Sequence, residues 1–204
     1  PPRAAMKSAS TERKTALNKQ QIRLKATSYI LCALFAALIA AGSYIKIPLP
    51  LVPVTLQLQF ALLAGILLGP SKGALACLVY ALAGLAGIPV FTGGGGLQYI
   101  VNPTFGYIAG FIAGAFTAGY TVSRFAKRGT AACFTAFSAG TLAVYTAGMA
   151  YLYLMKRFTL GEAVDTHAFL ISVLLIPLAA DTVKNAVFAA LAARVLPLTG
   201  KYIV

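Results

Sequence analysis

Six apolar segments follow one another along most of this sequence, and they restrict its fold more than any other feature. Their approximate bounds are 26–45, 54–68, 74–88, 104–122, 131–155 and 168–196. Four of them reach or exceed the roughly 17 to 25 residues that an α-helix needs to cross a bilayer, while 54–68 and 74–88 fit short, tilted or partly re-entrant helices. Because 59% of the residues are hydrophobic, the sequence predicts an all-α integral membrane protein, a bundle of six transmembrane helices. We expect the last helix to bend at Pro177.

Basic residues gather before the first apolar segment. Seven of the 17 Lys and Arg residues lie within positions 1–25, and the formal net charge is +13. A basic segment next to an apolar helix sets topology and touches anionic lipid. We therefore expect a mobile cytoplasmic tail over 1–25 and a single membrane domain over 26–204, with membrane lipid but no nucleic acid among its partners.

The remaining charges predict the orientation. With the N-terminus inside, the inner segments hold 13 basic residues, whereas the outer loops hold only Lys46, Lys156 and Arg157. Positive charge accumulates on the cytoplasmic side of membrane proteins. Both termini are therefore expected in the cytoplasm, in a multi-pass protein of the plasma (inner) membrane.

A run of four glycines, Gly93 to Gly96, interrupts the apolar pattern on the expected outer side. Hydrogen-bonding side chains follow at Gln98, Tyr99, Asn102 and Thr104. Glycine brings bare backbone N–H groups within reach of a ligand, and irregular backbone at membrane level occurs only where protein buries it or where it lines a watery cavity. We expect an outer binding loop in which Gly95 and Gly96 contact the ligand. Asn102 either joins them or caps the helix that starts near Thr104.

Asp181 and Lys184 form the only charged pair inside an apolar segment. Three residues apart, they share one helix face. Ionisable groups at this depth cost at least about 2.5 kcal/mol each unless they are paired or solvated. The pair either locks the sixth helix to a neighbour or lines a substrate cavity. We favour the cavity, with Asp181 accepting hydrogen bonds from the ligand. Lys184 would orient Asp181, donate to a ligand oxygen or meet a ligand carboxylate.

Three further polar residues are candidates for the same cavity. Gln57 and Thr55 open the second apolar segment, where they contact the ligand or cap the helix. Tyr107, one turn after the glycine loop, could stack on the ligand or bond to it, although tyrosines at this depth often form an interfacial belt.

Small residues recur every fourth position on two helices. Gly106, Gly110 and Gly114 continue directly from the binding loop and are expected to pack internally. On the first helix the stripe consists of Ala33, Ala37 and Ala41. This alanine stripe either packs internally or faces a partner.

Several chemistries are excluded by missing motifs. The sequence has no G-x-x-x-x-G-K-[ST] phosphate loop and no G-x-S-x-G element, and its one histidine, His167, lacks cysteine or carboxylate neighbours at metal spacing. We expect neither an enzyme nor a metal or cofactor site. Any energy for transport must come from elsewhere.

Several short motifs also occur along the sequence in an order that resembles that of a known family. They are Thr55-Leu-Gln57, Gly69-Pro70, Tyr80, Gly84, Gly87-Ile-Pro89-Val-Phe, the glycine run, Pro103-Thr104 and Gly106-Tyr107. This order is similar to that of the BioY family, the biotin-specific substrate-binding (S) components of energy-coupling-factor transporters. The likeness runs from about Tyr29 to the C-terminus and is densest between Pro53 and Gly114. Asn102 replaces the family's usual glycine, and Phe105 replaces a small residue.

The resemblance implies a high-affinity biotin-binding subunit energised by a transmembrane coupling subunit and ATPase subunits. It places Asp181 and Lys184 at the family's acidic and basic positions on the last helix, with Asp181 suited to the ureido N–H groups of biotin. It also implies that the alanine stripe docks on the coupling subunit. Two alternatives remain, a stand-alone secondary carrier or facilitator for biotin and an S component for another vitamin.

Overall fold

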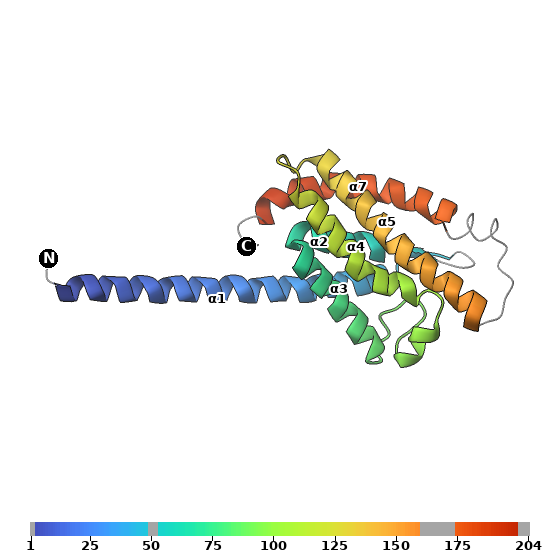
Figure 1. The fold of residues 1–204 in the computed structure, drawn as a ribbon, viewed down its shortest axis with the longest axis horizontal. Coiled ribbons are helices and arrows are strands. Elements are labelled where there is room, and N and C mark those ends of the chain that lie inside the picture. The colour runs from blue at the N-terminus through green and yellow to red at the C-terminus, as the bar shows by residue number, and fades with distance from the viewer. Residues whose placement is uncertain (1–2, 49–52, 160–173, 200–204) are drawn as a thin grey trace.

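The computed structural model describes residues 3–48, 53–159 and 174–199. Its first helix, α1 (Arg3–Gly42), runs for 40 residues, and its first part projects away from the other helices (Figure 1). At 1.5 Å per residue this is about 60 Å. The basic segment and the first predicted span are thus one helix, with no break at residue 26, because no proline or glycine precedes Gly42 in it.

A short hairpin follows α1. Strands β1 (Lys46–Ile47) and β2 (Val54–Thr55) pair antiparallel, with Lys46 opposite Thr55 and Ile47 opposite Val54. The proline-rich connector of the sequence analysis lies here, and its residues 49–52 are outside the described part of the chain. The hairpin precedes α2 directly and brings Thr55 to the start of that helix.

Two short helices come next, α2 (Gln57–Leu68) and α3 (Pro70–Leu85). Only Gly69 separates them, so α3 begins four residues earlier than the predicted 74–88. Gly69 adopts φ 84°, which glycine accepts without strain, and Pro70 fits the first position of a helix because its missing N–H would have no partner there.

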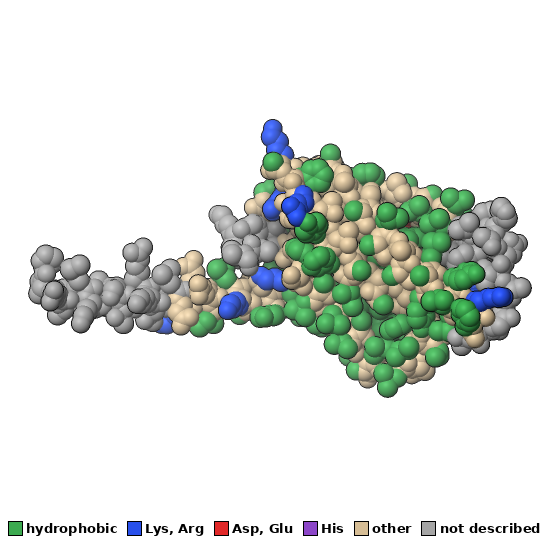
Figure 2. Space-filling view, in the orientation of Figure 1, with side chains coloured by type: hydrophobic (Ala, Val, Ile, Leu, Met, Phe, Trp, Pro, Cys, Tyr) green, Lys and Arg blue, Asp and Glu red, His purple; other side chains and the backbone are tan. Residues whose placement is uncertain are grey.

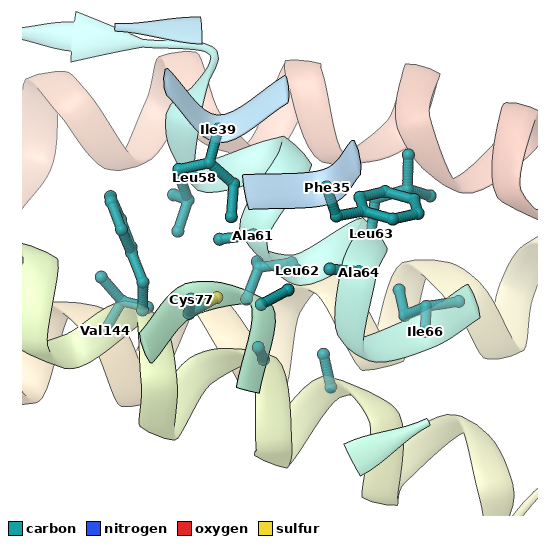
Figure 3. Packing of buried hydrophobic residues seen from close by; sticks show 14 of the residues in the cluster. Phe35, Ile39, Leu58, Ala61, Leu62, Leu63, Ala64, Ile66, Cys77 and Val144 are labelled. Atoms are coloured by element: carbon teal, nitrogen blue, oxygen red, sulfur yellow. The ribbon is translucent and has the colours of Figure 1, made fainter. Parts of the chain in front are cut away.

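Helix α2 forms the centre of the bundle. Every residue from Gln57 to Leu68 except Phe60 is buried, as expected for a helix that is apolar all round. Figure 3 shows its side chains against those of α1, α3 and α5, where the packed residues are Phe35, Ile39, Leu58, Ala61, Leu62, Leu63, Ala64, Ile66, Cys77 and Val144.

The helices α4 (Phe105–Ser123) and α5 (Thr130–Leu154) match the predicted fourth and fifth segments within one residue at each end. They pack closely against each other, and α4 also packs on α2. The expected internal packing of Gly106, Gly110 and Gly114 is confirmed, since all three are buried against α5. At Gly65 of α2 an added Cβ would lie 2.0 Å from the backbone oxygen of Ala115, so α2 and α4 touch through their backbones.

A π-helical turn, η2 (Met155–Thr159), extends α5, and the last helix is α7 (Ile176–Thr199). Pro177 lies in the first turn of α7 rather than at a bend within it, a position that proline tolerates. Residues 160–173, which include the predicted start of the sixth segment, lie outside the described residues, as do 1–2 and 200–204.

Four described helices are long and apolar enough to cross a membrane, over Asn18–Gly42, Phe105–Ser123, Thr130–Phe158 and Ile176–Leu198. Helices α2 and α3 are apolar but shorter. Hydrophobic side chains cover much of the face in Figure 2, with Lys and Arg side chains toward its ends. This distribution suits a multi-pass membrane protein.

Candidate functional site

A cavity of about 570 Å³, its open mouth included, lies among β2, α2, the glycine-rich loop, α4, α5 and α7. Its lining comprises Pro53, Val54, Thr55, Gln57, Leu58, Thr92, Tyr99, Thr104, Tyr107, Ile108, Phe111, Val144, Tyr145, Pro177 and Asp181. The wall is therefore largely apolar, with a carboxylate, an amide and several hydroxyl groups.

Asp181 places a buried carboxylate in this wall. Its Oδ2 atom accepts a hydrogen bond from the hydroxyl of Tyr145 at 2.6 Å, and its Oδ1 atom lies 2.5 Å from Nζ of Lys184 and 3.3 Å from Nε2 of Gln59. The side chain is 7% exposed. A buried charge is tolerated when it is paired and hydrogen-bonded, and these three donors meet that condition.

Lys184 connects α7 to the hairpin. Its ammonium group donates to the backbone oxygen of Thr55 at 2.6 Å in addition to pairing with Asp181. Lys184 is not among the residues that line the cavity. The two interpretations of the charged pair are therefore compatible, because the pair ties α7 to β2 and also presents Asp181 to the cavity.

Polar residues buried behind the wall extend this network. The Gln59 amide also donates to Oδ1 of Asn185 at 3.3 Å, and Asn185 donates to the hydroxyl of Thr141 at 2.9 Å. All three side chains are buried. They join α2, α5 and α7 around Asp181, and this network holds the carboxylate in one orientation, although Oε1 of Gln59 has no hydrogen-bond partner among the described residues.

Gln57 stands at the first position of α2 and is also buried. The hydroxyl of Tyr80 donates to the backbone oxygen of Val90 at 3.3 Å, so its oxygen accepts from the Gln57 amide nitrogen. The Thr55 hydroxyl oxygen accepts the Gln57 backbone N–H at 3.3 Å. Thr55 and Gln57 thus order the helix start and line the cavity as well.

Tyr107 presents a hydroxyl group with no internal partner. The residue is 8% exposed and lines the cavity, and among the described residues its hydroxyl oxygen has no hydrogen bond. Its ring meets that of Tyr145 edge to face, with centroids 5.8 Å apart. Since buried hydroxyls normally find partners, this one is available to a ligand.

A row of three hydroxyl groups, those of Thr92, Tyr99 and Thr104, forms another part of the cavity wall. The oxygens of Thr92 and Tyr99 lie 3.2 Å apart, and those of Tyr99 and Thr104 also lie 3.2 Å apart. Asn102 ends the row, because its Oδ1 atom accepts both the N–H of Thr104 at 3.0 Å and its hydroxyl at 2.8 Å. Asn102 thus orders the start of α4 and does not itself line the cavity.

The glycines of the loop lie behind this row of hydroxyl groups. Gly96 adopts φ 105°, and its N–H donates to the oxygen of Gly84 at 2.7 Å. A Cβ added to Gly95 would lie 2.2 Å from the backbone oxygen of Ile88. Both glycines let the loop pack closely on the end of α3, and neither is among the residues that line the cavity.

The alanine stripe of α1 faces away from the bundle. Ala33, Ala37 and Ala41 are all exposed, whereas Cys32, Phe35 and Ile39 on the other side of the helix are buried. The stripe is therefore not part of the internal packing of the described residues.

The structure brings together five of the eight predicted ligand contacts, with Thr55, Gln57, Tyr107 and Asp181 in the wall and Lys184 bonded to two of them. It also places Phe105, the second departure from the family pattern, against Tyr151 rather than in the wall.

The sequence did not predict two residues of the wall, Tyr145 and Thr92. Nothing in their local sequence marks them, because a hydroxyl in an apolar segment is common and only the fold supplies its partner.

Comparisons with known proteins identify the family of this chain. The model of the BioY family matches residues 13–201. The chain belongs to the BioY family. Among its relatives, a probable biotin transporter BioY of Lysinibacillus sphaericus is 44% identical over 154 residues, which cover 75% of this chain and 77% of that protein. The biotin transporter BioY of Thermotoga maritima is 38% identical over 171 residues, 83% of this chain and 95% of that one.

A solved structure has the same fold. It is the crystal structure of the S-component for biotin from an ECF-type ABC transporter, with a TM-score of 0.69 and 24% identity over 87% of this chain and 93% of the other. In this BioY-family chain, all the lining residues except Val144, Tyr145, Pro177 and Asp181 lie between Pro53 and Gly114. That is the region in which the family motifs are densest.

Proposed function

We propose that this chain is a biotin-binding membrane subunit of a biotin uptake system. The observation that carries the proposal is the buried carboxylate of Asp181 in the wall of a largely apolar cavity, in a family whose relatives are named biotin transporters. That membership also supports a transport protein rather than an enzyme.

The polar groups of the cavity suit the ureido ring of biotin. A carboxylate accepts hydrogen bonds from ureido N–H groups, and Asp181 is held for this by Tyr145, Gln59 and Lys184. The free hydroxyl of Tyr107 can donate to the ureido oxygen. Gln57 and Thr55 add polar contacts from β2 and α2, while Gly95, Gly96 and Asn102 support the loop that closes this side.

The proposed orientation follows from charge and helix order. Six membrane helices with both termini in the cytoplasm place 13 basic residues inside and three outside. The six helices of this arrangement are α1, α2, α3, α4, α5 and α7. The hairpin and the glycine-rich loop then face the outer side of the plasma membrane. The basic part of α1 then lies at the inner surface, next to anionic lipid.

Partner subunits supply the energy in this proposal. The sequence carries no phosphate loop of its own, and a neighbour in fold is an S-component of an ECF-type transporter. We place the docking surface for a transmembrane coupling subunit at Ala33, Ala37 and Ala41, whose small exposed side chains allow close helix approach. ATPase subunits would act through that coupling subunit.

Binding of radiolabelled biotin to the detergent-purified chain tests the proposal. We expect tight binding of one biotin per protein chain. Binding should be lost in Asp181→Asn and kept in Asp165→Asn, which removes a carboxylate outside the apolar segments of the sequence. No binding by the folded wild-type chain, with binding of another vitamin instead, would contradict the biotin assignment. Uptake by proteoliposomes that hold this chain alone would favour a stand-alone carrier over a subunit.

A further inference from the structure

The wall of the cavity offers hydrogen-bond acceptors on its hydroxyl side. A backbone N–H can only donate, so the Asn102 atom that meets the N–H of Thr104 is the amide oxygen. The Thr104 hydroxyl donates to that oxygen, Tyr99 therefore donates to Thr104, and Thr92 donates to Tyr99. The hydroxyl protons of Thr92, Tyr99 and Thr104 are therefore all used in these internal hydrogen bonds, and only the lone pairs of these oxygens remain for a ligand.

A carboxylate on the ligand is disfavoured against this wall. At the lining hydroxyls of Thr92, Tyr99 and Thr104 it would meet only lone pairs, and Asp181 adds a negative charge to the same wall. The unpartnered hydroxyl of Tyr107 is an uncharged donor and does not compensate a full negative charge. Biotin carries a carboxylate at the end of a flexible chain. That group must reach a cation elsewhere.

Lys184 is poorly placed for this role. Its ammonium group already lies 2.5 Å from Asp181 and 2.6 Å from the Thr55 oxygen, and the residue is outside the lining. Its charge is compensated within the bundle.

Lys46 is a cation in contact with the cavity wall. It pairs with Thr55 in the hairpin register, and its Nζ atom donates to the backbone oxygen of Thr92 at 3.0 Å, so both of its neighbours line the cavity. Lys46 is exposed, and within the described part of the chain no acidic side chain pairs with it. Within the described residues only one of its three ammonium protons has an acceptor, so the other two can bind an anion.

We propose that Lys46 binds the carboxylate of the ligand at the mouth of the cavity, an inference that rests on the biotin-binding function proposed above. The ligand then lies with its ureido ring at Asp181 and its carboxylate at the hairpin. Lys46 is a specificity-determining residue in this arrangement, because it selects for an anionic end.

A comparison of biotin with its uncharged methyl ester tests the assignment. We expect the purified wild-type chain to bind the ester about 5- to 20-fold more weakly than biotin, as for the loss of one partly solvated charged hydrogen bond. Lys46→Gln should weaken biotin binding by the same factor and leave ester binding unchanged within about 2-fold. Lys46→Arg should restore the preference for biotin.

Tyr44→Phe is the matched control, because the Tyr44 hydroxyl ties the same two segments through the oxygen of Pro89 at 2.7 Å without carrying charge. It should affect both ligands alike. The role of Lys46 would be overturned if Lys46→Gln weakened binding of biotin and its ester equally, or did not weaken biotin binding at all. A loss of affinity in Tyr44→Phe that affects biotin alone would overturn it as well. A wild-type chain that binds neither ligand would instead overturn the proposed function.

Discussion

Lys184 and Asp181 lie one turn apart on α7, with Nζ and Oδ1 separated by 2.5 Å and with the Thr55 oxygen completing the contacts of the ammonium group. The pair therefore holds three parts of the site in register. It fixes the carboxylate, the last helix and the strand that precedes α2. Its two members are unequal, since the Asp181 side chain is 7% exposed and that of Lys184 is 19% exposed.

Removal of either partner should have different effects on stability. Lys184→Met leaves a buried carboxylate uncompensated, and we expect it to cost about 3 kcal/mol, the lower end for broken buried pairs because Lys184 is partly exposed. Asp181→Asn should cost less, because the remaining ammonium group can reach solvent. The double variant should recover part of the stability but no biotin binding. Thermal unfolding in detergent, read beside biotin binding, measures both, and equal unfolding midpoints for the two single variants would contradict this account.

Tyr107 and Tyr145 offer a matched pair of hydroxyl deletions. Tyr107→Phe removes a hydroxyl with no partner among the described residues, so stability should stay the same or rise by up to about 1 kcal/mol, whereas biotin affinity should fall about 10-fold. Tyr145→Phe removes the 2.6 Å hydrogen bond to Asp181 and should lower both the stability of the chain and its affinity for biotin. A loss of stability in Tyr107→Phe without a change in affinity would assign that hydroxyl a structural role.

The fold was largely predictable where apolar segments are long. The bounds of α4 and α5 agree with the sequence within one residue, because the lipid-facing and buried sides of a spanning helix are both apolar. The prediction was weaker at α3, where Pro70 was interpreted as part of a turn although it starts a helix. A proline after glycine is compatible with both, and only the φ of 84° at Gly69 decides between them.

The candidate site was predictable where burying a side chain costs free energy. Asp181 is such a residue, since a carboxylate inside an apolar segment is rare and often marks a functional site. Tyr145 and Thr92 carry no such cost, and their roles arise from contacts with residues 36 and 7 positions away. The four glycines were an informative signal for a loop, but Gly95 and Gly96 pack on the end of α3 and are not among the residues that line the cavity.

Asn102 should act through the start of α4. Asn102→Ala removes the acceptor for the N–H and hydroxyl of Thr104, the residue just before α4, and we expect a loss of about 1 kcal/mol, as for other lost hydrogen bonds. Asn102→Asp keeps an oxygen at the same place and should retain the stability. Thermal unfolding of the two variants checks this, and equal losses would show that the cap does not depend on an acceptor.

The contact between α2 and α4 should tolerate no added methyl group. Gly65→Ala would place Cβ 2.0 Å from the Ala115 backbone oxygen, so the helices must separate, and we expect a loss of about 2–4 kcal/mol or failure to accumulate. Gly129→Ala is the control, because no atom lies within 4 Å of its added Cβ. Unfolding midpoints and yields of the two variants decide whether the close approach is needed.

Ala37 should matter for uptake but not for binding. Ala37→Leu enlarges the centre of the exposed alanine stripe without touching the bundle, so unfolding and biotin affinity of the purified chain should stay at wild-type values. If a coupling subunit docks there, the larger side chain keeps the two helices apart, and partner-dependent biotin uptake should fall at least about 10-fold. Ala113→Leu enlarges an exposed alanine on another helix, α4, and should leave uptake intact. Uptake assays in cells with and without the partner subunits separate these outcomes, and normal uptake by Ala37→Leu would move the docking surface away from α1.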